Sequence, residues 1–220
     1  MHIDKGYIRA SPYVGIFMRA SDDFILVPDS ISDKEFSQVA SVFTNTKIIK
    51  CSMAGSQLIG ILSISLKNKI AVSDIVTEKE IAHLRHYGLQ VHVIKGVSAI
   101  GNLVCLNEFG GLCSKALTES QVKELATFFE IPFLRMTIAK SDLVGASCVA
   151  TSKGFIVNPG INEEEFKKIK SIFKINGQLT SSNYGDRFVG NGIIANNNGV
   201  LVGDHTTTHE LIRIDEAFRE

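Results

Sequence analysis

The sequence predicts an α/β fold in which five similar ββαβ units, each of about 44 residues, form one closed, propeller-like ring. An apolar residue followed by glycine recurs five times, at spacings of 41 to 45 residues. A helix-capping pattern recurs at one fixed distance after each of these glycines. The fifth unit lacks its last strand, whereas a strand-like segment without a unit of its own precedes the first glycine. A ring explains both facts, because that segment can complete the fifth unit.

The glycine anchors open each unit. They are Val14-Gly15, Ile59-Gly60, Ile100-Gly101, Val144-Gly145 and Val189-Gly190. We expect the first strand of each unit to enter through this pair. Twelve residues after each glycine a short apolar run ends, which indicates the second strand. These run ends are Val27, Val72, Cys113, Val157 and Val202.

A helix follows the second strand in every unit. Seventeen residues after each glycine stands a good helix N-cap: Ser32, Thr77, Thr118, Asn162 or Thr207. Three residues further on stands Glu or Gln, which completes the pattern of a capping box. Apolar residues then recur at i, i+3 and i+7, the spacing of one helix face. Each unit is therefore expected to carry one helix with a defined start and one buried face.

A last strand completes each unit, as in the runs 47–50 and 91–94. We interpret 1–220 as a single domain with repeats at about 13–57, 58–99, 100–142, 143–187 and 188–220, closed by residues 2–12. The fifth repeat stops after its helix, so the N-terminal segment supplies its last strand. Such closure leaves no open sheet edge.

The composition is that of an ordinary soluble globular protein, with 45% hydrophobic and 21% charged residues. Lys and Arg together number 23, as do Asp and Glu, which argues against phosphate contacts as the main source of affinity. The start has no apolar run typical of a signal peptide, and no stretch approaches the roughly 20 apolar residues of a membrane span. We therefore expect a cytoplasmic protein with reduced cysteines and no membrane contact.

Five capped α/β units that close through the N-terminal segment resemble the pentein architecture. Within it, the sequence resembles the translation initiation factor 6 family of archaea and eukaryotes. The similar segments are residues 52–55, 98–102, 143–145, 158–159 and 206–211. The resemblance covers essentially the whole chain, and the colinear set of five segments is what makes it specific. The chain ends just after the fifth helix, without the tail of eukaryotic members, which makes it similar to the archaeal ones.

The resemblance implies a non-enzymatic, monomeric factor without a cofactor. It implies binding to the large ribosomal subunit on the face that meets the small subunit, so that joining is blocked by occlusion. Contacts would be chiefly to ribosomal proteins, with ribosomal RNA nearby. Some eukaryotic members carry a basic residue directly after the second-repeat glycine, where this chain has Ile61. An RNA contact at that corner is therefore left open.

Gly101 and Asn102 match family positions linked to subunit binding. Asn102 follows its glycine where three other units carry Ile16, Ile61 and Ala146. The polar amide has two readings: a strand-end amide satisfied by backbone, or a contact to a partner. Asn191 is the same substitution in the fifth unit. The candidate partner-binding residues are thus Gly101, Asn102 and Asn191.

Two rival readings of the ring remain open. The first is a pentein-fold guanidine-modifying enzyme (a hydrolase or amidinotransferase), which would use a Cys nucleophile in a late loop. The cysteines of this chain are Cys51, Cys105, Cys113 and Cys148, and the late loop 203–207 contains none. We therefore predict no catalytic residue and interpret the four thiols as buried apolar side chains. The second rival is a generic protein-interaction ring.

Two charged clusters are weaker candidates for functional sites. His205 and His209 are four residues apart beside acidic neighbours, yet the N-cap at Thr207 separates them, so we predict no metal site. Lys167, Lys168 and Lys170 form a small basic face on the fourth helix, which is either solvated or in contact with phosphate.

Overall fold

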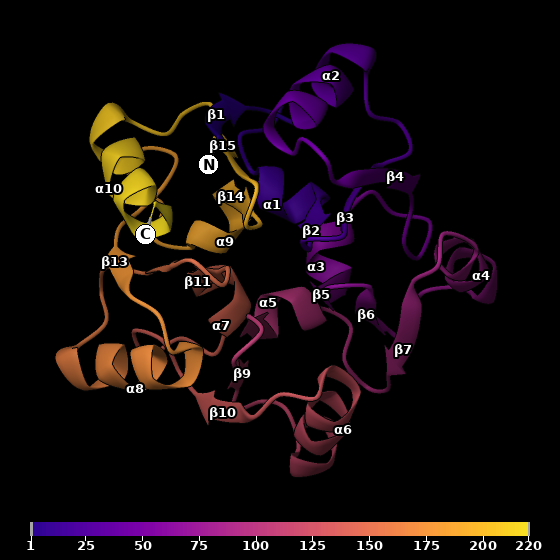
Figure 1. Ribbon diagram of the computed structural model, residues 1–220. Coiled ribbons are helices and arrows are strands. Elements are labelled where there is room, and N and C mark those ends of the chain that lie inside the picture. Colours follow the sequence, from indigo (N-terminus) through magenta and orange to yellow (C-terminus); the bar gives the residue numbers. More distant parts are fainter. Residues whose placement is uncertain (1, 220) are drawn as a thin grey trace.

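Each repeat folds into a three-stranded sheet, and five such sheets stand like blades around a central axis (Figure 1). The structure is a computed structural model and describes residues 2–219. The innermost strand of each blade lies beside the innermost strands of the two neighbouring blades. These inner strands are β2 (Arg19–Ala20), β5 (Ser63–Leu66), β8 (Val104–Leu106), β11 (Cys148–Ala150) and β14 (Ile193–Ala195).

The middle strand of each blade is antiparallel to the inner strand and parallel to the outer one. The middle strands are β3 (Phe24–Pro28), β6 (Lys69–Ser73), β9 (Gly111–Ser114), β12 (Phe155–Val157) and β15 (Gly199–Gly203). Four outer strands are β4 (Lys47–Cys51), β7 (Gln90–Ile94), β10 (Phe133–Met136) and β13 (Gly177–Leu179). The fifth is β1 (His2–Gly6), which pairs with β15 so that His2 lies opposite Gly199 and Gly6 opposite Gly203. The N-terminal segment thus supplies the outer strand of the last blade.

One long helix packs at the perimeter of each blade (Figure 1). These helices are α2 (Asp33–Val42), α4 (Glu78–His86), α6 (Glu119–Phe129), α8 (Glu163–Phe173) and α10 (Thr208–Phe218). All five carry the predicted capping box, in which the cap side chain accepts from the backbone N–H of the Glu or Gln three residues on. Their inward faces are buried, as Val39, Leu125 and Ile214 illustrate.

The hydrophobic core lies between neighbouring blades. One cluster, for example, joins Phe24 and Leu26 of β3 to Ile70 and Val72 of β6. Each blade therefore buries apolar side chains against its neighbours as well as against its own helix, so the repeats stabilise one another. The predicted fold class, an α/β pentein ring of five ββαβ repeats, is confirmed.

One expectation was wrong: the apolar–glycine pairs do not begin strands. They lie in one-turn helices that precede the inner strands: α1 (Val14–Phe17), α3 (Ile59–Leu62), α5 (Ile100–Leu103), α7 (Val144–Ser147) and α9 (Val189–Gly192). A single helical turn is too short to show a 3.6-residue period, so the sequence pattern could not separate it from a strand.

The five glycines form a ring of close backbone contacts around the axis. A Cβ on Gly60 would lie less than 3.0 Å from the carbonyl oxygen of Gly15, and one on Gly101 equally close to that of Gly60. The same relation joins Gly145 to Gly101, Gly190 to Gly145, and Gly15 back to Gly190. The glycines recur because a side chain at any of them would push two blades apart.

Candidate functional site

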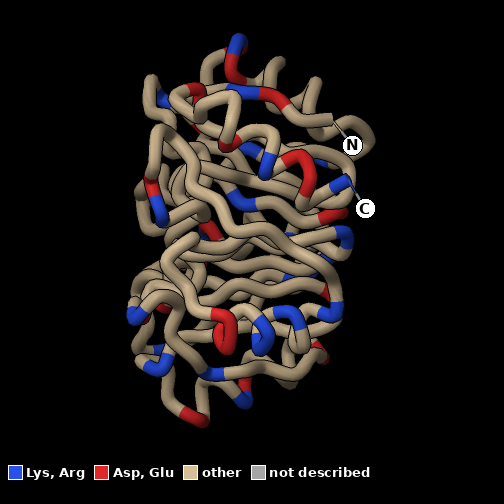
Figure 2. Tube along the Cα trace, turned by 90° about the vertical axis from the view of Figure 1, so that its left-hand side faces the viewer, with Lys and Arg blue, Asp and Glu red and all other residues tan. Residues whose placement is uncertain are grey.

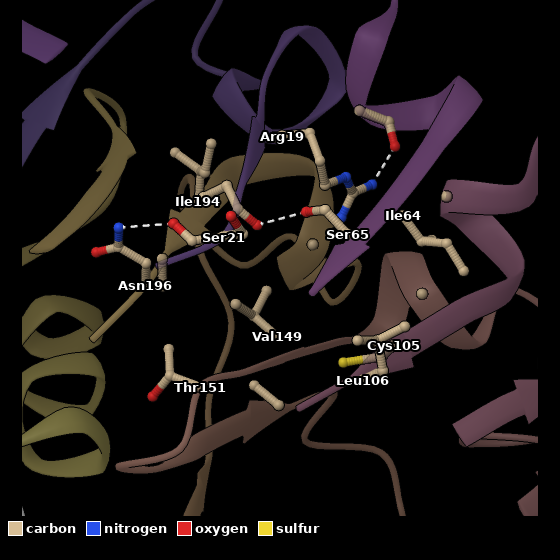
Figure 3. Close-up of a pocket in the computed structure, with 18 of the residues that line it drawn as sticks. Arg19, Ser21, Ile64, Ser65, Cys105, Leu106, Val149, Thr151, Ile194 and Asn196 are labelled. Atoms are coloured by element: carbon tan, nitrogen blue, oxygen red, sulfur yellow. Dashed lines mark hydrogen bonds between the residues drawn. The ribbon is translucent and has the colours of Figure 1, made fainter. Parts of the chain in front are cut away.

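A cavity of about 100 Å³ lies between the five blades, and we call this axial cavity the channel. Its wall is formed by the inner strands, and Figure 3 shows their side chains converging on it. Each inner strand starts just after a one-turn helix and ends at a hairpin turn. We call the end with the one-turn helices the helix end, and the end with the five hairpin turns the turn end.

Hydrogen bonds within and between blades hold the turn end. The Asn107 side-chain oxygen accepts from the backbone N–H groups of Phe109 and Gly110, at 3.0 and 3.1 Å. The Asn196 side-chain oxygen accepts in the same way from Asn198 and Gly199, and its amide donates to the backbone oxygen of Ser21 in the next blade. The side chains of Asn107 and Asn196 are thus engaged in the fold.

The two candidate asparagines differ from Asn107 and Asn196 in the hydrogen bonding of their side chains. Asn102 and Asn191 line the cavity at its helix end, and both are half-buried. Their backbone N–H groups donate to Ala99 and Phe188, at 3.0 and 2.9 Å. Within residues 2–219 neither side-chain amide has a hydrogen-bond partner. They lie in α5 and α9, so the reading of a strand-end amide satisfied by backbone was wrong. Both amides are free to bind water or a partner.

The three candidate residues share one end of the channel but not one blade. Gly101 and Asn102 belong to the third blade and Asn191 to the fifth, with Ala146 of α7 between them. Gly101 is buried, and the ring of glycine contacts explains its lack of a side chain. Its substitution would act through the packing of the blades.

A set of exposed apolar side chains encircles the helix end. Tyr13, Leu58 and Leu143 are the N-cap residues of α1, α3 and α7, and each is 38–39% exposed. Ala99 and Phe188 hold the equivalent positions and are half-buried. Exposed apolar residues grouped at one end of a protein can mark an interaction surface. This apolar rim was missed, although an apolar residue stands two positions before each repeated glycine.

Basic residues occupy four of the five loops that lead into the one-turn helices. They are Arg9, Lys95, Lys140 and Arg187, and all are exposed. Asp142 and Asp186 are the acidic residues of the same loops. Elsewhere, charged residues of both signs are spread over the molecule (Figure 2). The zero net charge thus coexists with a modest local excess of basic residues at the helix end.

The capping-box carboxylates also hold these loops in place. Glu80 accepts from the backbone N–H groups of Ala54, Gly55 and Thr77, each at 2.9 Å. Ala54 and Gly55 both have a left-handed backbone, with φ of 52° and 65°. Burial by itself raises the pKa of Glu80, but the hydrogen bonds outweigh it, so that the pKa lies below the ordinary value of 4.5. Glu210 holds the loop of the fifth blade in the same manner.

Arg19 lies inside the channel, and the sequence analysis did not identify it as a candidate residue. Its Nη2 donates to the backbone oxygen of Gly60, while its Nε is buried and has no hydrogen-bond partner within residues 2–219. The residue as a whole is half-buried, and its side chain lines the cavity. Burial lowers the pKa of Arg19 to about 10, so it remains charged at neutral pH.

The four cysteines are free and buried. Burial raises the pKa of Cys51 to about 12 and that of Cys113 to about 11, which leaves both as thiols. Burial likewise raises the pKa of Cys148, which lies beside Cys105. Cys105 lines the channel, but no histidine is among the channel-lining residues that the structure describes. A nucleophilic thiol there would lack the usual imidazole base.

Acidic side chains lie beside both charged clusters. His205 Nε2 lies 3.9 Å from Asp204 Oδ1, and within residues 2–219 no three His, Cys, Asp or Glu side chains are grouped closely enough to hold a metal ion. On α8, Lys167 and Lys168 pair with Glu163 and Glu164, each at 2.6 Å. No helix within residues 2–219 has both the length and the apolar content needed to span a bilayer.

Comparisons with known proteins agree with the expected resemblance. A family model described as the eIF-6 family matches residues 3–217. Translation initiation factor 6 of Pyrococcus abyssi is 31% identical over 225 residues, which span 99% of each chain. The same factor of Sulfolobus acidocaldarius is 31% identical, with 100% of each chain covered. That of Picrophilus torridus is 32% identical, with 98% of this chain and 99% of the relative covered.

One similar solved structure is that of an enzyme. It is a variant of dimethylarginine dimethylaminohydrolase, crystallised as an adduct with S-methyl-L-thiocitrulline. The TM-score is 0.51 at 13% sequence identity, over 94% of this chain and 73% of the enzyme. At that identity the likeness concerns the fold alone, and it agrees with the pentein architecture.

Proposed function

The chain belongs to the eIF-6 family, and on that premise we propose that it binds the large ribosomal subunit and blocks its joining to the small subunit. The relatives are named translation initiation factor 6, which describes a non-enzymatic factor. The protein would act as a monomer in the cytoplasm, where the two subunits meet.

The helix end is the surface that this binding would use. The observation that carries the proposal is that the free amides of Asn102 and Asn191 emerge there, inside the apolar rim of Tyr13, Leu58 and Leu143. An apolar patch with polar groups at its centre can bury area while the amides fix the register of the partner. At the turn end, by contrast, the channel-lining asparagines Asn107 and Asn196 are bonded within the fold.

To block joining by occlusion, the protein must bind the large subunit tightly and fill the space of the small subunit, but it need not catalyse a reaction. A standard interface buries roughly 800 Å² on each partner. That area is less than a tenth of the 9511 Å² surface of this protein, so one end of the ring can supply it. The bound ring would then fill space that the small subunit needs. Ribosomal proteins are the natural principal partners of an apolar rim.

Ribosomal RNA would lie at the margin of the contact. Arg9, Lys95, Lys140 and Arg187 surround the helix end and can reach phosphates. A few such contacts add a salt-dependent contribution without dominating the affinity. This agrees with the equal numbers of acidic and basic residues in the chain.

Co-sedimentation with isolated large subunits tests the proposal. Asn102→Trp places a bulky ring at the centre of the helix end, and we expect it to weaken binding by at least roughly tenfold. Glu108→Trp adds the same ring at the exposed turn end and should leave binding unchanged. Circular dichroism and melting confirm that both variants fold. A generic interaction ring would not co-sediment with large subunits at all.

Light scattering of subunit mixtures separates occlusion from mere binding. The apparent joining constant should weaken by the factor 1 + [L]/Kd, where [L] is the concentration of free protein. At 100 times Kd this corresponds to about 2.7 kcal/mol. The Asn102→Trp variant should lose binding and anti-joining activity in parallel. If the wild type bound tightly and left joining unchanged, occlusion would be wrong.

A further inference from the structure

One layer of the channel breaks the fivefold symmetry. The residue four positions after each repeated glycine points into the channel in all five blades (Figure 3). In four blades this residue is an apolar side chain or a thiol: Ile64, Cys105, Val149 and Ile194. In the first blade it is Arg19. A fixed positive charge therefore stands in an otherwise apolar layer.

The guanidinium of Arg19 has donors to spare. Of its five N–H groups, one on Nη2 is used by the backbone oxygen of Gly60. The buried Nε has no partner among the described residues. The missing side chain of Gly101 makes room for the group, because Nη2 lies 2.7 Å from where a Cβ on that residue would stand. The fold thus accommodates the charge without satisfying it.

No carboxylate within residues 2–219 forms an ion pair with Arg19. The acidic residues that line the channel are Asp22 and Glu108, which lie in hairpin turns at the turn end. Asp22 already accepts from the backbone and side chain of Asn197, at 2.8 and 2.7 Å. Lys67 is the other basic residue of the lining. Charges withdrawn from bulk water are normally paired with an opposite charge, whereas the partner that Arg19 has among the described residues is a neutral carbonyl, so its charge favours an anion.

We propose that the channel binds a small oxyanion, with inorganic phosphate as the representative ligand, against the free donors of Arg19. The cavity of about 100 Å³ is well above the roughly 10–15 Å³ that a single water molecule needs, so it has room for a small ion. The free amide of Asn102 lines the same cavity and can donate to the ion. Guanidinium groups hold oxyanions through parallel N–H···O bonds, which gives this cavity a preference for oxyanions over halides.

Thermal melting at constant ionic strength tests the site. Inorganic phosphate should raise the Tm of the wild type along a saturable curve, by roughly 5–10 °C at 100 times Kd. In Arg19→Met, which keeps the length of the side chain without the charge, the rise should vanish. Arg213→Met removes an exposed Arg on α10 and should keep the full rise. Phosphorus NMR provides a second readout, with line broadening that the wild type shows and Arg19→Met lacks.

Three results would overturn the proposal. The first is a wild type whose Tm and phosphorus signal do not respond to phosphate. The second is an equal response in Arg19→Met, which would place the effect on the surface. The third is a response to chloride as large as that to phosphate, which would mean charge neutralisation without oxyanion recognition. If Arg19→Met fails to fold, Arg19→Gln provides the same comparison with a polar side chain.

Discussion

Replacing Gly60 by alanine tests the ring of backbone contacts directly. The added Cβ would lie less than 3.0 Å from the carbonyl oxygens of both Gly15 and Met18, in the preceding blade. A Cβ has no rotamer by which to avoid such a clash, so the two blades would have to separate. Because the five blades close on one another, a shift between two of them is resisted by the other three.

The loss of stability expected for Gly60→Ala is the difference between two opposing contributions. Overpacking of a tight interior costs about 1–3 kcal/mol, and contact with fixed backbone places this site at the upper end. Alanine regains up to about 1 kcal/mol of helix propensity relative to glycine. The net loss is therefore about 2 kcal/mol. For a chain of this size, that corresponds to a fall in Tm of roughly 4–8 °C.

Scanning calorimetry or melting by circular dichroism measures this shift. Gly160→Ala is the matched control, because the nearest atoms to its Cβ would be the Asn158 side-chain oxygen at 3.2 Å and the Ala139 Cβ at 3.4 Å. We expect the control to change stability by less than about 1 kcal/mol. A Gly60→Ala protein that melts within 1 °C of the wild type would refute the reasoning that close approach requires these glycines.

Three further predictions concern closure, the thiols and acid stability. Deleting residues 2–9 removes β1 and the fully buried Ile8, so the Tm should fall steeply; an unchanged Tm would contradict closure through the N-terminal segment. Changing all four cysteines to serine should lower stability but leave co-sedimentation with large subunits intact, and turnover of an arginine derivative that depends on one thiol would contradict this. The folded-state pKa of Glu80 lies below its ordinary 4.5, so its stabilisation is present above that value and is lost as the pH falls through the lowered pKa. The midpoint of urea unfolding should therefore drop on acidification, and the drop should be smaller in Glu80→Gln.

Features that depend on local rules could be predicted from the sequence. A capping box needs only a cap residue and its partner three positions on, so the starts of all five long helices were predicted correctly. The buried helix faces follow from a 3.6-residue period over three turns. The missing strand of the last blade pointed to the N-terminal segment because an open sheet edge is unfavourable.

Features that depend on the packing between blades could not be predicted. The exposure of Tyr13, Leu58 and Leu143 depends on how neighbouring blades pack around them, which no single repeat encodes. The free amide of Asn102 was assigned to a strand end because a four-residue helix leaves no periodic signal. The enclosure of Arg19 likewise requires all five inner strands to be in place.

Departures from the repeat are nevertheless visible in the sequence, and they indicate where to look for function. Positions that only build the ring must satisfy the same packing in every blade, so they should be alike in all five, as the glycines are. Asn102 and Asn191 depart from that rule at the helix end, and Arg19 departs from it inside the channel. Each places polar or charged donors where apolar equivalents already fold well, which costs stability unless a ligand or partner compensates. The experiments on Asn102 and Arg19 therefore test the same point at two depths of the channel. Each identifies what binds the hydrogen-bond donors that the fold leaves without a partner.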